Sequence, residues 1–479
     1  MAPNGHRHGP SSSMFAQTTE PMPLPSRFAR IKECLVSGKE AQIQASWMRL
    51  LAKLKTEIDV IVDAGPNIFP WIQFEDLTNT SATESFSSQL KERGVAVIRG
   101  VIPRDVAVQW KAETDAYLDE DPRSHRLPTH DPHLYGVYWS PAQIKARAHE
   151  NILQTQRFLM NLWHSSDPTA LVSPNFPVSY ADRMRIRNPE DEACSLSFYV
   201  DGGSVERWEP DGYGLAGTYR RIWDGEWEDW DPWESSTRLK VTSDLYNGDG
   251  SCSMIRMFQG WVSLSDIPVG EGTLLLCPMI RLTTAYLLLR PFFTPIQSSP
   301  SHPDFLSPEN WTLEKPVSSI IQGALPSYPQ ELNDAFHPHL QLSRSMIPIP
   351  RLAPGDYLVW HCDAIYALDR LRRPDLPTTA ILYLPACPLT QTNALYLSRQ
   401  RKAFLTSEPG PDFGGAPGVE GSIGGEEVVR EVGEAGGVDG MRAMGLLPWD
   451  EDDALDDCEQ AVLEMANGIL FPEKYDMGY

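Results

Sequence analysis

Basic residues are scarce in this sequence, and their scarcity limits the partners the protein can have. Of 479 residues, 41 are Lys or Arg and 64 are Asp or Glu, which gives a formal net charge of −23. A surface this acidic repels the phosphates of nucleic acids and the headgroups of anionic lipids. Uninterrupted apolar runs of about eighteen residues, the length that spans a bilayer, are also missing. We therefore expect neither nucleic acid nor membrane as a partner.

The cysteines lack the spacing of a disulfide framework or of a structural zinc site. They are odd in number, widely scattered and without a C-x-x-C pair, at Cys34, Cys194, Cys252, Cys277, Cys362, Cys387 and Cys458. The N-terminal stretch also lacks the charged-then-apolar order of a secretory signal. These absences predict a cytoplasmic protein with reduced thiols. No feature identifies a protein partner.

What the sequence does contain is enough apolar surface for a large core, since 41% of residues are hydrophobic and aromatic residues are frequent. Composition divides the chain into four parts. Residues 1–26 are rich in Pro and Ser and predict a disordered arm. Residues 27–413 predict the main domain, helical over 27–170 and β-rich over about 171–413. Residues 414–440 are rich in Gly and Glu and predict a flexible insertion, and 441–479 predict a C-terminal helical segment.

Periodicity gives a coarse prediction of the elements. Apolar residues recur at helical spacing from Arg27 to about Ala64, and Ser140 followed by Pro141 predicts a helix start. A strand is expected at Val95 to Ile98 and a helix from about Arg104. Later, short β-rich runs such as "MRIRNP", "GTLLLCP" and "AILYLPACP" are separated by Gly, Pro and Asp. This pattern of short strands separated by turn residues predicts a jelly-roll barrel or sandwich rather than βαβ units.

Two β-rich stretches carry the candidate chemistry. In "FYVDGGSVERWE", Asp201 ends a strand and enters a Gly-Gly turn. In "APGDYLVWHCDAIYAL", a strand ends at His361, and Tyr366 follows. Non-haem iron oxygenases hold their metal with an H-x-D pair at one strand end and a histidine from a later strand. The first stretch has this spacing but reads Y-x-D, because Tyr199 stands in the histidine position.

The chain resembles the YbiU-like family, the domain of unknown function 1479. The resemblance covers about Ile31 to Phe413 and is carried by "RGVAVIRGVIPRDVA", "SYADRMRIRNP", "YVDGGSVERWE", "MIRMFQGWVSLS", "GEGTL", "LTTAYLLLRPFF" and "WHCDAIYAL". That family resembles Fe(II)/2-oxoglutarate dioxygenases. The resemblance implies an α+β fold with a double-stranded β-helix (jelly-roll, cupin-like) core, an N-terminal helical layer and helical decorations.

The resemblance also implies Fe(II) and 2-oxoglutarate as cofactors, and an oxidoreductase that hydroxylates or desaturates a small organic molecule. The metal positions of the family fall on Tyr199, Asp201 and Tyr366, so both histidines are replaced by tyrosine. His361 matches a family residue beside these positions and is a fourth candidate ligand. The aspartate of the family motif is present in this chain as Asp201.

Three interpretations of the tyrosines stay open. In the first, neutral phenols are weak ligands, the iron site is lost, and the protein is an inactive pseudoenzyme that acts as a binding or regulatory subunit without a cofactor. In the second, two phenolates with Asp201 and His361 form an oxygen-rich site for Fe(III). In the third, a nearby histidine substitutes and a modified 2-oxoglutarate or metal-independent reaction persists; the candidates are His164, His337 and His339.

A 2-oxo acid requires a cation for its distal carboxylate, usually an arginine. The candidates are Arg256, which alternates with apolar residues, and Arg372 and Arg373, which follow Tyr366; Arg185, Arg187 and Arg370 are further possibilities. Four tryptophans in one acidic loop either anchor that loop in the core or form a lid over an apolar substrate: Trp223, Trp227, Trp230 and Trp233.

Overall fold

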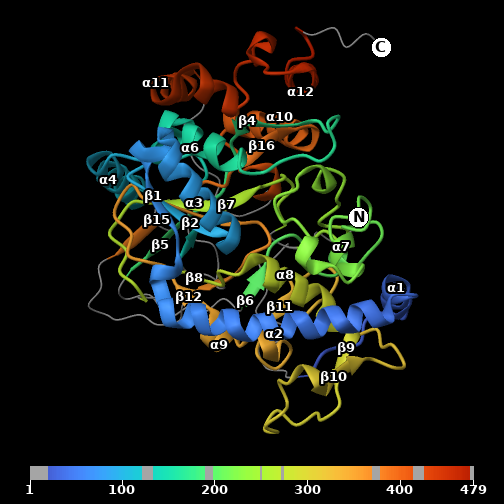
Figure 1. The fold of residues 1–479 in the computed structure, drawn as a ribbon. Helices are drawn as coiled ribbons and strands as arrows, with labels where there is room; N and C mark the ends of the chain where they lie inside the picture. The colour runs from blue at the N-terminus through green and yellow to red at the C-terminus, as the bar shows by residue number, and fades with distance from the viewer. Residues whose placement is uncertain are drawn as a thin grey trace, which may run out of the picture.

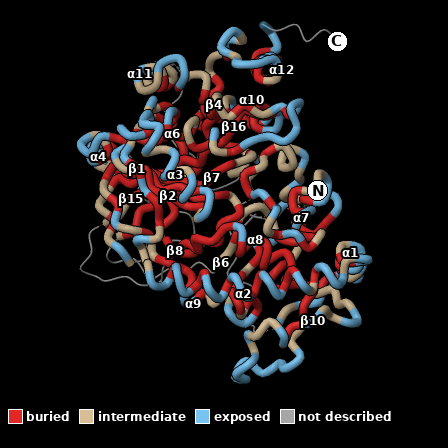
Figure 2. Tube along the Cα trace, in the orientation of Figure 1, coloured by how far each residue is buried: buried red, intermediate tan, exposed pale blue. Residues whose placement is uncertain are grey.

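The computed structural model of the chain describes residues 20–120, 133–188, 198–248, 251–270, 274–368, 378–413 and 426–474. Two β-sheets lie face to face at the centre, and helices cover the outer face of each sheet (Figure 1). The structure combines helices and sheets, as the α+β prediction requires. Buried residues concentrate in the sheets and on the inner faces of the helices (Figure 2).

The larger sheet has seven strands in the order β1-β2-β13-β7-β15-β5-β3. All neighbours are antiparallel except β1 and β2, which are parallel. Its strands are β1 (Trp71–Gln73), β2 (Val95–Arg99), β3 (Leu134–Tyr135), β5 (Met184–Arg187), β7 (Phe258–Ser263), β13 (Tyr357–His361) and β15 (Thr379–Tyr383).

The smaller sheet has five strands in the order β11-β6-β14-β8-β12, all antiparallel. Its strands are β6 (Phe198–Val200), β8 (Leu274–Leu276), β11 (Glu331–Leu332), β12 (Ile347–Pro348) and β14 (Ile365–Leu368). The chain therefore crosses repeatedly between sheets, because β5, β7, β13 and β15 belong to the larger sheet and β6, β8, β12 and β14 to the smaller.

Alternation along each strand sorts the side chains into separate cores, since successive residues of a strand point to opposite faces. In β13, Tyr357 and Val359 join the core under one helical layer, whereas Leu358 and Trp360 join the core between the sheets. In β14, Ile365 faces outward, and Tyr366 packs against the intersheet core. Strand parity therefore decides which residues face the space between the sheets.

Two helical layers cover the sheets. Helices α3 (Thr80–Arg93), α4 (Arg104–Glu120), α5 (Pro141–Ala148) and α6 (Glu150–Met160) pack on the larger sheet. Helices α1 (Arg27–Val36), α2 (Glu40–Ala64) and α8 (Ile280–Leu289) cover the smaller one. The long α2 runs across the face of the smaller sheet (Figure 1). The short helices are α7 (Arg220–Trp223) and α9 (Leu342–Ser345).

The remaining elements lie at the edges of this sandwich. Strands β4 (Val172–Val178) and β16 (Cys387–Thr390) pair with each other and pack with α10 (Gln391–Leu405) and α12 (Asp457–Leu470). Strands β9 (Phe293–Pro295) and β10 (Trp311–Leu313) form a separate hairpin. Helix α11 (Glu426–Ala443) packs against α5.

The predicted strand at Val95, the helix from Arg104 and the N-cap at Ser140 are confirmed. Three predicted parts of the chain differ from the structure: the helical part, the arm and the insertion. The predicted helical part 27–170 also supplies β1, β2 and β3 to the larger sheet. Residues 1–19 of the predicted disordered arm lie outside the described residues. Residues 20–26 are placed against the fold, because Leu24 is buried in the core beside α1 and donates its backbone N–H to Ser319.

The predicted flexible insertion, residues 414–440, instead forms α11 from Glu426 onward. Its Val428 and Val432 are buried against α5. Glycines that suggested flexibility in the sequence are packing residues here. A side chain at Gly436 would overlap the carbonyl oxygen of Ala148, and one at Gly440 would come within 2.9 Å of it. The absence of a side chain lets the two helices approach closely. Residues 414–425 lie outside the described part.

Among the described residues, we find no helix with the length and apolarity needed to cross a membrane.

The helix contact gives a stability prediction. Gly436→Ala places a methyl group against the Ala148 carbonyl and should lower the free energy of unfolding by about 1–3 kcal/mol, as overpacking does. Gly433→Ala in the same helix is the matched control, because its methyl group would meet only Met441, at 3.9 Å. Thermal unfolding of both variants checks this. Equal melting temperatures would mean that the close α5–α11 contact does not form.

Candidate functional site

The two tyrosines and the aspartate picked out in the sequence meet between the sheets. Strands β6 and β14 pair antiparallel with Tyr199 directly opposite Tyr366. Their rings are 4.3 Å apart between centroids. One residue beyond β6, the carboxylate of Asp201 accepts a hydrogen bond of 2.7 Å from the Tyr366 hydroxyl to Oδ1. Residues far apart in the chain therefore form one cluster.

The second carboxylate oxygen of Asp201 is held by the opposite sheet. The amide nitrogen of Gln259 on β7 donates to Oδ2 at 2.6 Å. The guanidinium of Arg256, just before β7, reaches the same oxygen at 3.2 Å and forms an ion pair. Asp201 and Arg256 are half-buried, with side chains 13% and 14% exposed. Both carboxylate oxygens are thus engaged, and the negative charge is balanced by Arg256.

The phenols at this site are held in their neutral form. Burial, followed by the negative charge of Asp201, raises the pKa of Tyr199 above its ordinary value of 10. The same two causes raise the pKa of Tyr366 well above 10, and Tyr199 adds to them. Near neutral pH both hydroxyls keep their protons, and that of Tyr366 donates to Asp201.

These residues do not fit Fe(II). A metal at this place would have only one carboxylate and two neutral phenols, which are weak ligands compared with imidazole. It would also lie beside the guanidinium of Arg256, whose positive charge repels a divalent cation. We therefore assign no chemical step to iron in this chain.

His361, the fourth residue predicted as a metal ligand, is committed elsewhere. It is fully buried, its Nδ1 accepts from the backbone N–H of Asp363 at 3.0 Å, and its Nε2 donates to the carbonyl of Pro232 at 3.0 Å. The ring stacks on Trp163 with centroids 4.7 Å apart. Burial lowers its pKa to about 4, so the imidazole is neutral, and neither nitrogen has a lone pair left for a metal.

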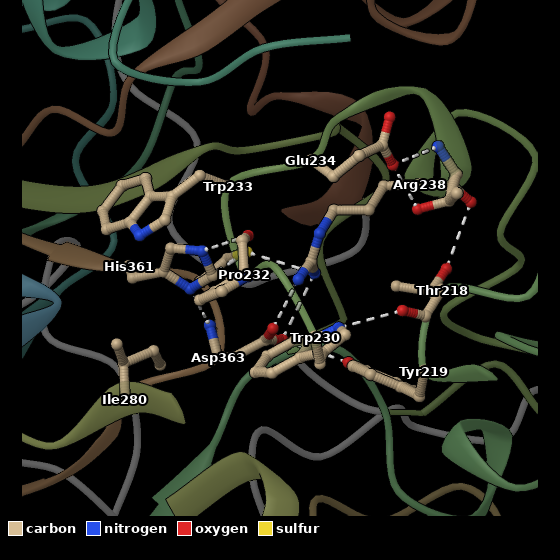
Figure 3. Close-up of polar contacts among 12 residues, drawn as sticks. Thr218, Tyr219, Trp230, Pro232, Trp233, Glu234, Arg238, Ile280, His361 and Asp363 are labelled. Carbon is tan, nitrogen blue, oxygen red and sulfur yellow. Dashed lines mark hydrogen bonds and ion pairs between the residues drawn. The ribbon is translucent and has the colours of Figure 1, made fainter. Parts of the chain in front are cut away.

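A buried ion pair lies beside His361 and joins Arg238 to Asp363, which is in the turn between β13 and β14 (Figure 3). Arg238 contacts Asp363 at 2.6 Å, and the Tyr219 hydroxyl donates to the same carboxylate at 3.2 Å. Burial alone would raise the pKa of Asp363, but Arg238 and His361 lower it to about 2. The atoms that could bind a metal on His361, Cys362 and Asp363 lie within 4.8 Å of one another. Because Asp363 is paired with Arg238, this cluster orders the turn that leads to Tyr366.

The alternative histidines do not reach the cluster around Asp201. His164 is half-exposed and lies 3.6 Å from Asp231. His337 and His339 pack against Tyr286 of α8, on the outer side of the smaller sheet. The third interpretation, in which another histidine replaces the lost ligands, therefore has no support among the described residues.

Of the predicted arginines, Arg256 is at the site, as the ion-pair partner of Asp201. Arg372, Arg373 and Arg370 lie outside the described residues. Arg185 and Arg187 lie on the intersheet side of β5, and Arg185 donates to the hydroxyl of Tyr383 at 3.0 Å.

The four loop tryptophans anchor the loop in the core rather than covering a substrate. Trp223, Trp227 and Trp230 are buried in the core on the side of α2 and α8, and Trp233 is buried in the core on the side of α3 to α6. Trp233 also packs edge-on against His361. The loop is thereby fixed over the β13–β14 turn.

Among the described residues that contact Asp201, Gln259 is one that the sequence analysis did not predict. The signal was weak, since "MFQGWV" is one polar residue in an apolar strand. Strand parity places Gln259 and Trp261 on the same face, and Trp261 is in the intersheet core. A buried glutamine there requires a polar partner, and that partner is Asp201.

Comparisons with known proteins agree with this architecture. The structure of GlcNAc Inducible Gene 2 (DUF1479) from Candida albicans superposes with a TM-score of 0.83 at 28% identity, covering 95% of this chain and 97% of that one. The "Putative Oxidoreductase" of Salmonella typhimurium LT2 gives a TM-score of 0.71 at 26% identity, covering 89% of this chain and all of that one. YbiU of Escherichia coli K12, an uncharacterized protein, is 28% identical over 416 residues, which cover 84% of this chain and 93% of YbiU.

The sequence pattern of the Gig2-like family matches residues 22–446. This match spans both sheets, both helical layers and the cluster around Asp201. The predicted relationship to the YbiU-like proteins of DUF1479 is thereby confirmed, and this chain belongs to the Gig2-like family.

Proposed function

We propose that this protein is a metal-free relative of the 2-oxoglutarate oxygenases that binds a small organic molecule. The observation that carries the proposal is the pairing of Asp201 with Arg256, Gln259 and Tyr366. In this arrangement a guanidinium supplies the positive charge that a metal ion would supply in an oxygenase. The protein is then a binding or regulatory pseudoenzyme rather than an active dioxygenase.

The strand order supports the oxygenase ancestry. In the larger sheet, β5, β15, β7 and β13 are neighbours, and in the smaller sheet β6, β14, β8 and β12 are neighbours. Strands taken in chain order therefore alternate between two facing antiparallel sheets, the pattern of a double-stranded β-helix. The Y-x-D stretch lies at the end of β6, and Tyr366 lies in β14 directly beside it. A jelly-roll core with a degraded metal triad accounts for both features.

The site retains what binding needs. It is half-buried, it combines a cation with neutral hydrogen-bond donors, and it lies next to the apolar intersheet core. Small-molecule sites commonly combine an apolar lining with a few well-placed polar groups. A redox reaction with O2 needs in addition a metal with open coordination positions, and the donors around Asp201 leave none.

The first test is metal content. Protein purified without chelator, then incubated anaerobically with Fe(II) and desalted, should retain far less than one iron per chain and should form no succinate from 2-oxoglutarate. The physical reason is that the neutral phenols bind Fe(II) weakly and the neighbouring guanidinium repels it. Elemental analysis and a succinate assay measure this, with an active 2-oxoglutarate oxygenase treated in parallel.

Stoichiometric iron with succinate formation would overturn the proposal and restore the dioxygenase. A stoichiometric, coloured ferric protein with a tyrosinate-to-iron absorption band would overturn it in favour of the Fe(III) interpretation.

The second test rebuilds the metal site. Tyr199→His with Tyr366→His supplies two imidazoles but leaves Arg256 on the carboxylate. Adding Arg256→Met removes the competing cation, so the triple variant should bind Fe(II) about tenfold more tightly than the double variant. Isothermal titration with Fe(II) under argon measures the affinities.

The matched control replaces Arg351, which has a side chain 74% exposed and contacts Asp266, in the same double-variant background. Arg351→Met should leave the Fe(II) affinity of the double variant unchanged. If the double variant already binds iron as tightly as the triple variant, Arg256 is not the obstacle.

A further inference from the structure

Arg256 has hydrogen-bonding capacity that the protein leaves unused. A guanidinium carries five N–H donors. Within the part of the chain that the structure describes, Arg256 makes a single hydrogen bond, from Nη2 to Asp201. Its side chain is 14% exposed, so water alone can reach it only partly. A half-buried guanidinium with unused N–H donors favours a ligand group with several acceptor oxygens, such as a carboxylate, because the ion pair with Asp201 engages only one of those donors.

Gln259 leaves the complementary group unused. Asp201 is an acceptor, so the amide nitrogen of Gln259 must face it, which turns Oε1 away from the carboxylate. Gln259 is only 7% exposed, and its Oε1 has no hydrogen-bond partner among the described residues. A buried acceptor without a partner is costly unless a ligand or water supplies a donor.

The two unused groups lie within the span of one small molecule. The Arg256 guanidinium and the Gln259 amide both contact the same atom, Oδ2 of Asp201, at 3.2 and 2.6 Å. A ligand with a carboxylate on Arg256 and a donor group on the neighbouring carbon can therefore be oriented with that donor toward Oε1 of Gln259. The ligand needs an anion at one position and an N–H or O–H donor at the next.

We propose that this site binds a 2-hydroxycarboxylate, with the carboxylate on Arg256 and the hydroxyl donating to Oε1 of Gln259. A hydroxyl suits the second position because it supplies the donor without adding a charge to a site in which Arg256 and Asp201 already balance each other. The proposal rests on the metal-free site proposed above and specifies the class of its ligand.

Matched acid pairs test the proposal on the unmodified protein. Lactate and propionate, malate and succinate, and 2-hydroxyglutarate and glutarate differ within each pair by one hydroxyl group. At equal ionic strength, the hydroxy acid of at least one pair should bind at least about tenfold more tightly than its partner, since a site with a buried acceptor penalises a ligand that lacks the donor. Calorimetry measures the affinities, and the shift in melting temperature confirms them.

The amino acids of the same series, alanine, aspartate and glutamate, should bind more weakly than the corresponding hydroxy acids. If no hydroxy acid binds more tightly than its deoxy partner, or if an amino acid binds best, the proposed ligand class is wrong. Neither result bears on the iron and succinate assays, so failure of the ligand class and failure of the metal-free site remain distinguishable.

Two variants test which residues cause the preference for the hydroxy acid. Gln259→Leu removes the acceptor and should abolish the preference for the hydroxy acid, while the deoxy acid still binds through Arg256. Arg256→Lys keeps the charge but loses the planar fork, and should weaken both members of a pair. Arg351→Lys, at an exposed position, is the control for charge and should change neither affinity. If Gln259→Leu keeps the preference, the hydroxyl does not contact Gln259.

Discussion

The carboxylate of Asp201 has to be balanced by positive charge, because it lies half-buried between two sheets where water can solvate it only in part. In an oxygenase a metal ion provides that balance. In this chain Arg256 provides it, with Gln259 and Tyr366 completing the hydrogen bonds. The same negative charge helps to keep both phenols protonated, since it raises the pKa of Tyr199 and Tyr366. Charge balance and protonation at this site therefore have one origin, the carboxylate of Asp201.

Strand pairing explains why these groups meet. Tyr199 and Tyr366 are opposite each other in an antiparallel pair, so their side chains share a face of the smaller sheet. Gln259 shares its face of the larger sheet with Trp261, and that face is turned toward the smaller sheet. A shift of one residue in the register of β6 would send Tyr199 to the helical side. The packing of Ile365 and Ala367 in the core under α2 and α8, together with the Arg238–Asp363 ion pair, holds the register of β14.

Much of the fold and part of the candidate site could be predicted from the sequence, because the sequence features that indicate them are local. The β-rich runs, the helix starts and the Y-x-D spacing all depend on neighbouring residues. What the sequence left open depends on partners far along the chain. His361 appeared to be a ligand until its nitrogens were seen to bond Pro232 and Asp363. The glycines of α11 suggested flexibility, although they allow contact with Ala148. Neither the hydrogen-bond partners of His361 nor the contact of α11 with Ala148 can be recognised from the spacing of residues in the sequence.

In the metal-free site that we propose, an arginine in place of a metal changes what the site can do. A metal ion has several coordination positions and can bind an acid and O2 at once. A guanidinium has a planar set of donors, cannot change oxidation state, and keeps its charge at any physiological pH. It can therefore hold an acid firmly but cannot activate oxygen. Selectivity must then come from groups beside it, and the unsatisfied Oε1 of Gln259 is the nearest such group. A site of this kind would recognise its ligand by hydrogen-bond complementarity, which suits the binding or regulatory role that we propose.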